Sequence, residues 1–195
     1  SGEITGGLFG TSYNVMYTTG GACPDFLELQ VTTLNEEFSS FELTPTCDGA
    51  TAVITGDQGG TFSFVGGNPG DGSVINTTTG EITLGTYDTT YSVMYTTAGA
   101  CASVTELAVT TLTQDDPSFE LTPTCDGATA NILGDTGGTF SFVDGDPVDG
   151  AVIDQNSGEI TGGLFGTSYN VMYTTGGACP DFLELQVTTL NEEFS

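Results

Sequence analysis

Residues 1–39 read SGEITGGLFGTSYNVMYTTGGACPDFLELQVTTLNEEFS, and the same 39 letters recur as residues 157–195. The offset of 156 is twice a looser period of 78, because residues 40–117 and 118–195 are identical at 50 of 78 positions. Repeats of this kind mark tandem modules. The sequence therefore predicts a C-terminal half-repeat at 1–39 and full repeats at 40–117 and 118–195, about two and a half units of a longer array. Residues 1–39 are not expected to fold alone.

Lysine, arginine and histidine are absent from the 195 residues, which carry 26 aspartates and glutamates and a formal net charge of −26. Without imidazole there is no ordinary proton shuttle near neutral pH, and without cationic side chains there is no clamp for phosphate or carboxylate. Nucleic acid binding needs cationic side chains, and an anionic membrane surface would repel this chain. The composition therefore excludes nucleic acid as a partner and argues against an enzyme.

The rest of the composition indicates a folded chain, since hydrophobic residues make up 37% of it and charged residues only 13%. No stretch resembles a signal peptide or a span of about 20 apolar residues, so membrane insertion is not expected.

Each full repeat consists of short runs of alternating apolar and polar residues, separated by Gly, Asp-Gly, Asn and Pro. This pattern is typical of β-strands joined by tight turns. In the repeat from Ser40 the runs are Phe41 to Thr44, Ala50 to Thr55, Thr61 to Val65, Ser73 to Asn76, Glu81 to Leu84, Tyr91 to Thr97 and Glu106 to Leu112. Seven short strands in 78 residues predict an all-β fold of tandem immunoglobulin-like β-sandwich repeats, stacked head to tail.

Alternation also predicts which side chains form the core, because neighbouring residues on a strand point to opposite faces. The predicted core residues are Ala52, Ile54, Phe62, Phe64, Tyr91, Val93, Tyr95, Leu107 and Val109. Differences between the repeats support this choice: Val53 is matched by Asn131 and Ala108 by Gln186, all on predicted outward faces.

The five cysteines recur at regular positions, two in each full repeat: Cys23, Cys47, Cys101, Cys125 and Cys179. Their regularity indicates disulfides formed in an oxidising, extracellular setting, and the lack of histidine and of a CxxC motif argues against zinc. In an immunoglobulin-like strand order, Cys47 and Cys101 lie at opposite ends of one repeat.

Two patterns of pairing follow from that placement. In a head-to-tail stack the corner that holds Cys47 meets the loop that holds Cys179, so we favour a bond between consecutive repeats. Cys23, Cys101 and Cys125 would then pair with repeats outside these residues. The alternative is a bond inside each repeat, Cys47 to Cys101 and Cys125 to Cys179.

One loop has the composition of a cation site. Asp144, Asp146 and Asp149 lie on a Gly-rich loop and offer the hard oxygen ligands that calcium prefers. The other repeat has Gly66, Asn68 and Asp71 at these positions, so a site shared by both repeats is not expected, and Asp-Gly turn chemistry is the alternative explanation. No other cofactor is expected.

Acidic pairs also precede each full repeat: Glu36 and Glu37 before the first, Asp115 and Asp116 before the second. A cation bound there would neutralise the junction and stiffen the array, whereas the alternative is a solvated linker.

The succession LTPTCDGATA, GGTFSF, TGEIT, SYNVMYTT and GGACP resembles the bacterial Ig-like repeats of giant Bacteroidota cell-surface adhesins, including proteins associated with gliding motility and type IX secretion. The resemblance covers all three repeats and implies an Ig-like sandwich, export to the cell surface and a stalk role in adhesion. It carries over no catalytic residues. In the same group of bacteria, Asp88-Thr89-Thr90 resembles an O-glycosylation motif at Thr89, with a plain polar turn as the alternative.

These observations predict a structural segment: an extended, disulfide-stiffened stalk or fibre of a repetitive cell-surface or secreted adhesin, with no enzymatic activity. Its expected partners are neighbouring repeats, other copies in a fibre, and cell-surface glycans or abiotic surfaces bound through domains outside these residues. The alternatives are a filament or sheath protein that self-assembles laterally, and a carbohydrate-binding surface module.

Overall fold

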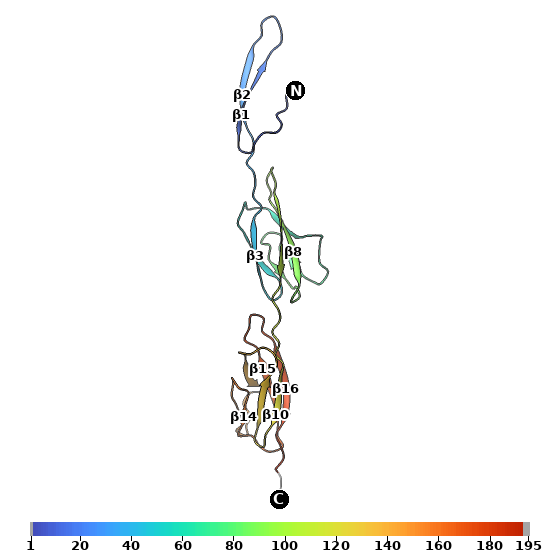
Figure 1. Cartoon of the computed structure of the whole chain (residues 1–195), viewed down its shortest axis with the longest axis vertical. Coiled ribbons are helices and arrows are strands. Elements are labelled where there is room, and N and C mark those ends of the chain that lie inside the picture. Colours follow the sequence, from blue (N-terminus) through green and yellow to red (C-terminus); the bar gives the residue numbers. More distant parts are fainter. Residues whose placement is uncertain (1, 193–195) are drawn as a thin grey trace. The chain divides into compact units, whose positions relative to one another are not determined.

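A computed structural model describes residues 2–192 of the protein. The described residues form β-strands joined by turns and contain no helix. The chain divides between Thr111 and Leu112 into two compact units, whose strands are coloured along the sequence in Figure 1. The predicted all-β fold with tandem β-sandwich repeats is confirmed.

The sandwich of the first unit consists of two antiparallel sheets. The four-stranded sheet has the order β3 (Phe41–Pro45), β4 (Ala50–Ile54), β7 (Ile82–Thr83), β6 (Val74–Ile75). The three-stranded sheet has the order β5 (Thr61–Phe64), β8 (Thr90–Thr96), β9 (Val104–Thr110). Each of the seven runs expected from the sequence therefore contains a strand.

The second unit repeats this topology. Its four-stranded sheet has the order β10 (Phe119–Pro123), β11 (Ala128–Ile132), β14 (Ile160–Thr161), β13 (Val152–Ile153). Its three-stranded sheet has the order β12 (Thr139–Phe142), β15 (Ser168–Thr174), β16 (Phe182–Thr188). Because 50 of 78 positions are identical, the same register recurs, for example Phe62 opposite Tyr95 and Phe140 opposite Tyr173.

Aromatic side chains from both sheets make up much of the core of each sandwich. In the first unit, Phe41, Phe62 and Tyr95 are at most 5% exposed, and the ring centroids of Phe62 and Tyr95 lie 4.5 Å apart. Tilted and edge-to-face arrangements of this kind add to the stabilisation from buried apolar area. The predicted core residues Phe64, Tyr91, Val93 and Val109 are also buried.

Three predicted core residues are less covered than expected. Ala52 and Ile54 are half-buried and pack against the core cluster, whereas Leu107 is 38% exposed. Leu107 lies on β9, an edge strand of its sheet that has a neighbouring strand on one side only. The predicted outward residues Val53, Ala108, Asn131 and Gln186 are all exposed.

Each sandwich includes the residues just before its first strand. The amide N–H of Phe38 donates to the Asp57 carboxylate at 2.8 Å, and the Asp57 N–H donates to the Phe38 carbonyl at 2.7 Å. The same reciprocal pair joins Asp116 and Asp135 in the second unit, at 2.8 and 2.7 Å. Asp57 and Asp135 thus bind the backbone just before the first strand of each sandwich.

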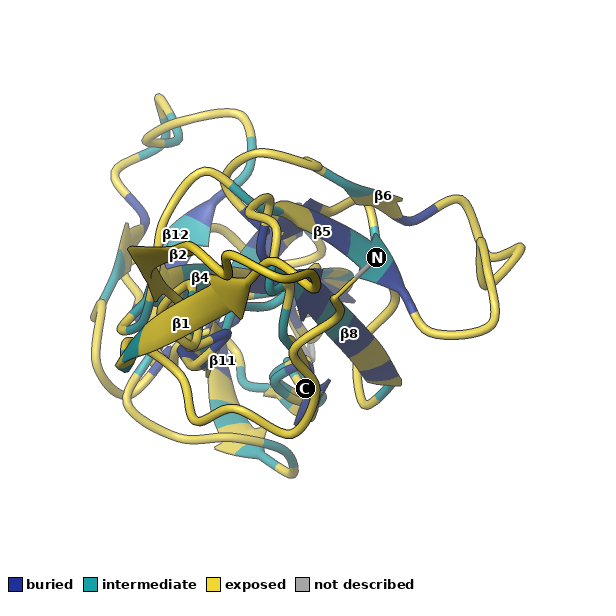
Figure 2. Cartoon of the chain, turned by 90° about the horizontal axis from the view of Figure 1, so that it is seen from above, coloured by how far each residue is buried: buried dark blue, intermediate teal, exposed yellow. Residues whose placement is uncertain are grey.

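The first unit also contains a two-stranded antiparallel hairpin, β1 (Ser12–Thr18) and β2 (Phe26–Thr32). Its sequence is that of β15 and β16, yet its side chains are almost all exposed. In Figure 2, β1 and β2 lie mostly in the exposed colour, whereas β8 alternates between buried and exposed. The same residues thus occur once as a bare hairpin and once as part of a sandwich.

Candidate functional site

Cys47 lies in a tight turn between β3 and β4. The Thr46 N–H donates to the Gly49 carbonyl at 3.0 Å, and the Gly85 N–H donates to the Asp48 carbonyl at 2.7 Å. A Cβ atom on Gly49 would lie 1.9 Å from the Ile82 carbonyl oxygen, so only glycine fits at this point. The turn is therefore fixed by backbone contacts, which hold the half-buried Cys47 in a defined place.

Cys179 lies in the loop between β15 and β16, which is hydrogen-bonded to the residues at the start of the second unit. The Asp115 N–H donates to the Cys179 carbonyl at 3.0 Å, and the Gly177 N–H donates to the Asp115 carboxylate at 2.9 Å. The Gln114 side-chain amide donates to Asp181 at 2.9 Å. Cys179 itself is buried.

The oxidation state of the cysteines differs between equivalent positions. Cys47 and Cys179 are each disulfide-bonded, whereas Cys23, Cys101 and Cys125 are free. Cys125 lies in the turn of the second unit that is equivalent to the turn of Cys47, because the Thr124 N–H donates to the Gly127 carbonyl at 2.9 Å in the same way. Because Cys101 and Cys125 are free, neither of the bonds considered within a repeat is formed.

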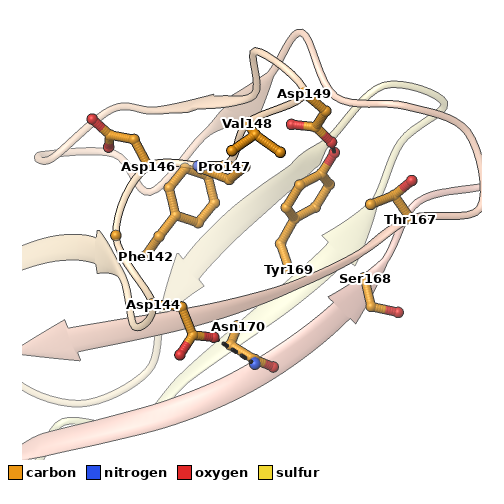
Figure 3. Close-up of a pocket in the computed structure, with 11 residues that line it drawn as sticks. Phe142, Asp144, Asp146, Pro147, Val148, Asp149, Thr167, Ser168, Tyr169 and Asn170 are labelled. Carbon is orange, nitrogen blue, oxygen red and sulfur yellow. Dashed lines mark hydrogen bonds between the residues drawn. The ribbon is translucent and has the colours of Figure 1, made fainter.

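The three aspartates of the acidic loop line one pocket of the second unit, with a volume of about 350 Å³ and an apolar wall formed by Phe142, Pro147 and Val148. Their carboxylates point to different partners (Figure 3). Asp144 accepts a hydrogen bond from the side-chain amide of Asn170 at 3.3 Å. Asp149 lies beside the Tyr169 hydroxyl, and the Asp146 carboxylate is directed away from both.

Asp149 has a structural role that its counterpart Asp71 shares. One oxygen of Asp149 accepts from the Tyr169 hydroxyl at 2.6 Å, and the other accepts from the Ala151 N–H at 3.1 Å. These two donors lower the pKa of Asp149, with the Tyr169 hydroxyl as the larger cause. Burial, followed by the hydrogen bond to Asp149, raises the pKa of Tyr169.

Asp71, the counterpart of Asp149 in the first unit, has a pKa that is lowered by a large amount. The hydroxyls of Ser73 and Tyr91, followed by the Ser73 N–H, lower the pKa of Asp71 to about 2. Tyr91 donates at 2.5 Å and the Ser73 N–H at 2.9 Å, whereas the Ser73 hydroxyl is near the carboxylate without the geometry of a hydrogen bond. The aspartate shared by both repeats thus anchors a loop to a core tyrosine.

The structure gives little support to a cation at either predicted place. Within residues 2–192, no three Asp, Glu, His or Cys side chains are grouped so that they could hold a metal, and this includes the acidic loop. At the junctions, Glu37 accepts from the Gly99 N–H at 3.1 Å and Asp116 accepts from the Ser118 N–H at 3.0 Å. The Ser118 hydroxyl and then its N–H lower the pKa of Asp116. Glu37 and Asp116 thus each cap a backbone N–H of the repeat that follows them in the sequence.

Thr89, the predicted glycosylation site, lies in the turn before β8 and is half-buried. Its hydroxyl is 2.7 Å from that of Thr86 and donates to the Tyr87 carbonyl at 3.1 Å. The preceding Asp88 has a φ of 51°, a conformation that suits a tight turn. The geometry agrees with the polar-turn alternative, since a glycan on Thr89 would have to displace these hydrogen bonds.

No helix that could cross a membrane occurs among the described residues. No family model matches the sequence, and no curated protein matches it. The resemblance to bacterial Ig-like adhesin repeats therefore remains a prediction, without assignment to a family.

Solved structures similar to this chain include extracellular cadherin domains. Domains 3–6 of protocadherin gamma B2 align with 94% of this chain and 59% of their own length, at 10% identity and a TM-score of 0.33. The EC22–24 segment of mouse cadherin-23 aligns with 93% of this chain and 74% of its own length, at 15% identity and a TM-score of 0.29. This chain thus spans less than two thirds of the protocadherin segment.

Proposed function

We propose that this chain is a structural segment of an extracellular repetitive protein, in which a disulfide between Cys47 and Cys179 joins consecutive repeats into a stiffened stalk or fibre. The neighbouring repeats of the same chain are the partners that this role requires. An adhesin of the cell surface is the protein class that the sequence resemblance implies.

The cysteine pattern is the observation that carries this proposal. Cys47 and Cys179 are disulfide-bonded, while the equivalent Cys125 and Cys101 are free. If each repeat formed its own disulfide, equivalent cysteines of the two repeats would have the same oxidation state. A bond from the turn of the first repeat to the loop of the second instead leaves the loop cysteine of the first, Cys101, and the turn cysteine of the second, Cys125, as free thiols. Disulfides persist in oxidising surroundings, which supports an extracellular location.

Both cysteines lie in segments that are well suited to transmit a load. The turn around Cys47 is held by backbone hydrogen bonds and by a glycine that allows no side chain, and the loop around Cys179 is tied to Asp115. A disulfide between two such segments would restrain the orientation of whole domains, because each cysteine is held in a fixed position within its own domain.

Non-reducing peptide mapping tests the pairing. Trypsin has no site in this chain, so the oxidised protein is digested with a protease that cuts after acidic residues. We expect one linked product that contains Cys47 and Cys179, with Cys23, Cys101 and Cys125 alkylated before digestion. A linked product of Cys47 with Cys101 would overturn the proposal.

A pair of matched variants sharpens this test. Cys47→Ser should leave Cys179 as a free thiol that reacts with iodoacetamide in denaturant, which exposes this buried residue, whereas Cys101→Ser should leave the map of linked peptides unchanged. If Cys179 of Cys47→Ser stays unreactive in denaturant, it pairs with another cysteine and the proposed connection between repeats is wrong.

A further inference from the structure

The turn between β6 and β7 has the sequence Asn76-Thr77-Thr78, in which a threonine follows two positions after an asparagine. This spacing is the acceptor pattern for N-linked glycosylation in secreted proteins. The other asparagines of the 195 residues lack a serine or threonine two positions later. The pattern therefore singles out Asn76.

Backbone hydrogen bonds fix the conformation of this turn. The Asn76 N–H donates to the Glu81 carbonyl, and the Gly80 N–H donates to the Asn76 carbonyl, both at 2.8 Å. The side chains of Asn76, Thr77 and Thr78 are exposed. The turn thus presents the whole acceptor pattern to solvent.

The two polar atoms of the Asn76 side chain have different surroundings. Oδ1 accepts from the Thr78 N–H at 2.9 Å and from the Thr79 N–H at 3.1 Å. Within residues 2–192, Nδ2 makes no hydrogen bond. Donors at the amide oxygen stabilise negative charge on it, which makes it easier for Nδ2 to lose a proton when it forms a new bond. The turn therefore leaves the reacting nitrogen accessible.

The equivalent turn of the second unit shows what the fold itself requires here. Asp154 replaces Asn76, and its carboxylate accepts from the Asn156 N–H at 2.9 Å and from the Ser157 N–H at 2.8 Å. Its own N–H donates to the Glu159 carbonyl at 2.8 Å. The turn needs a side-chain oxygen, which aspartate supplies as well as asparagine, so it does not account for the amide nitrogen of Asn76.

We propose that Asn76 is a site of N-linked glycosylation, with one glycan on the two full repeats. The donor is an oligosaccharide carried on a lipid diphosphate, and the catalyst is an oligosaccharyltransferase. Nδ2 forms a bond to the anomeric carbon of the sugar and loses a proton to a base of the transferase. The bond between that carbon and the diphosphate oxygen breaks, and the lipid diphosphate leaves with the electron pair.

A glycan at this position lies beside an unpaired strand edge. β6 ends at Ile75, directly before Asn76, and is an edge strand of the four-stranded sheet. Unpaired edges can pair with strands of other chains, whereas a bulky, hydrated glycan obstructs their approach. The modification therefore protects this edge of the first unit from lateral pairing.

Glycan transfer to the folded full chain tests the proposal. The chain is incubated with a purified oligosaccharyltransferase and its lipid-diphosphate-linked oligosaccharide, beside a short acceptor peptide that reports an active enzyme. We expect one glycan per chain by intact mass, and release by peptide N-glycosidase in heavy-oxygen water should convert Asn76 to a labelled aspartate. A chain that stays unmodified while the control peptide is consumed would refute the proposal.

Substitutions in the same turn identify the acceptor. Asn76→Asp reproduces the residue of the second unit, so it should abolish transfer and leave the midpoint of urea unfolding unchanged. Thr78→Ala should also lose transfer, whereas Thr78→Ser should retain it. A glycan on Asn76→Asp would show that another residue is the acceptor.

The second unit provides the converse experiment. Asp154→Asn combined with Asn156→Thr introduces the acceptor pattern into the equivalent turn, and we expect a second glycan. Asn156→Thr alone is the matched control and should gain none. A double variant with a single glycan would contradict the turn as the acceptor geometry. The proposal rests on the extracellular location inferred above, but transfer to purified protein does not depend on the Cys47–Cys179 pairing, so the two can fail separately.

Discussion

The hydroxyl of the buried Tyr91 donates a hydrogen bond of 2.5 Å to the carboxylate of Asp71. Tyr169 and Asp149 form the same pair in the second unit, at 2.6 Å. In both repeats the tyrosine hydroxyl also accepts a backbone N–H, from Thr86 at 3.0 Å and from Leu164 at 3.1 Å. A core side chain thus joins two turns at one end of each sandwich.

The lowered pKa of Asp71 predicts sensitivity to acid. Because the folded state favours the charged carboxylate, its contribution to stability is complete above the ordinary pKa of 3.8 and is lost as the pH falls towards about 2. A titration of the Asp71 carboxyl carbon by NMR should give a midpoint near 2. Asp71→Asn should flatten the pH dependence of unfolding in this window. A midpoint near 3.8 would contradict the inferred bonding.

The Tyr173 hydroxyl should stabilise the second unit. Tyr173→Phe leaves the Asp135 carbonyl and the Gly138 N–H without this partner, and we expect a loss of about 1–2 kcal/mol in the free energy of unfolding. The control is Tyr17→Phe, which has the same sequence context but a side chain 69% exposed. Urea unfolding should separate the two variants, and equal losses would be inconsistent with the structure.

Ile160 and Ile4 have the same neighbours along the sequence, so substituting each measures how much burial of the side chain contributes to the free energy of unfolding. Ile160 is 1% exposed, and Ile160→Ala should cost about 2–5 kcal/mol because it leaves a cavity in the core. Ile4 is 49% exposed, and Ile4→Ala should change stability by less than about 0.5 kcal/mol. Thermal and urea unfolding of the full chain measure both, and a large effect of Ile4→Ala would mean that residues 1–39 are covered in solution.

Gly127 is expected to tolerate no side chain. A Cβ atom there would lie 1.8 Å from the Ile160 carbonyl oxygen, so Gly127→Ala must displace backbone and should cost at least about 2 kcal/mol. Gly20→Ala is the matched control, since no atom lies within 4 Å of its Cβ position. A melting temperature unchanged by Gly127→Ala would show that the turn holding Cys125 is looser than described.

Much of the fold could be predicted from the sequence, since the 78-residue period and the alternation along the strands are both local signals. The runs at Tyr91 and Phe62 gave the correct faces because buried aromatic residues alternate with polar ones. The prediction was less accurate where strands are short: β6 and β7 have two residues each, whereas runs of four were expected. Turns beside them use the backbone groups that longer strands would pair.

The roles of the three aspartates in the acidic loop could not be predicted from composition alone. Asp144, Asp146 and Asp149 have the same chemistry, and only three-dimensional structure shows that Asp149 bonds to Tyr169 and Asp144 to Asn170. Comparison within the chain held a clue, because Asp149 has its counterpart in Asp71 while the other two do not. An acid kept in both repeats indicates a shared structural role rather than a site in one repeat.

The hairpin and the second sandwich provide an internal reference for spectroscopy. Tyr17 and Tyr173 have the same neighbours along the chain, but one is 69% exposed and the other 0% exposed. A difference between their chemical shifts or ring-flip rates therefore reports the effect of the surrounding protein alone, with amino-acid sequence held constant.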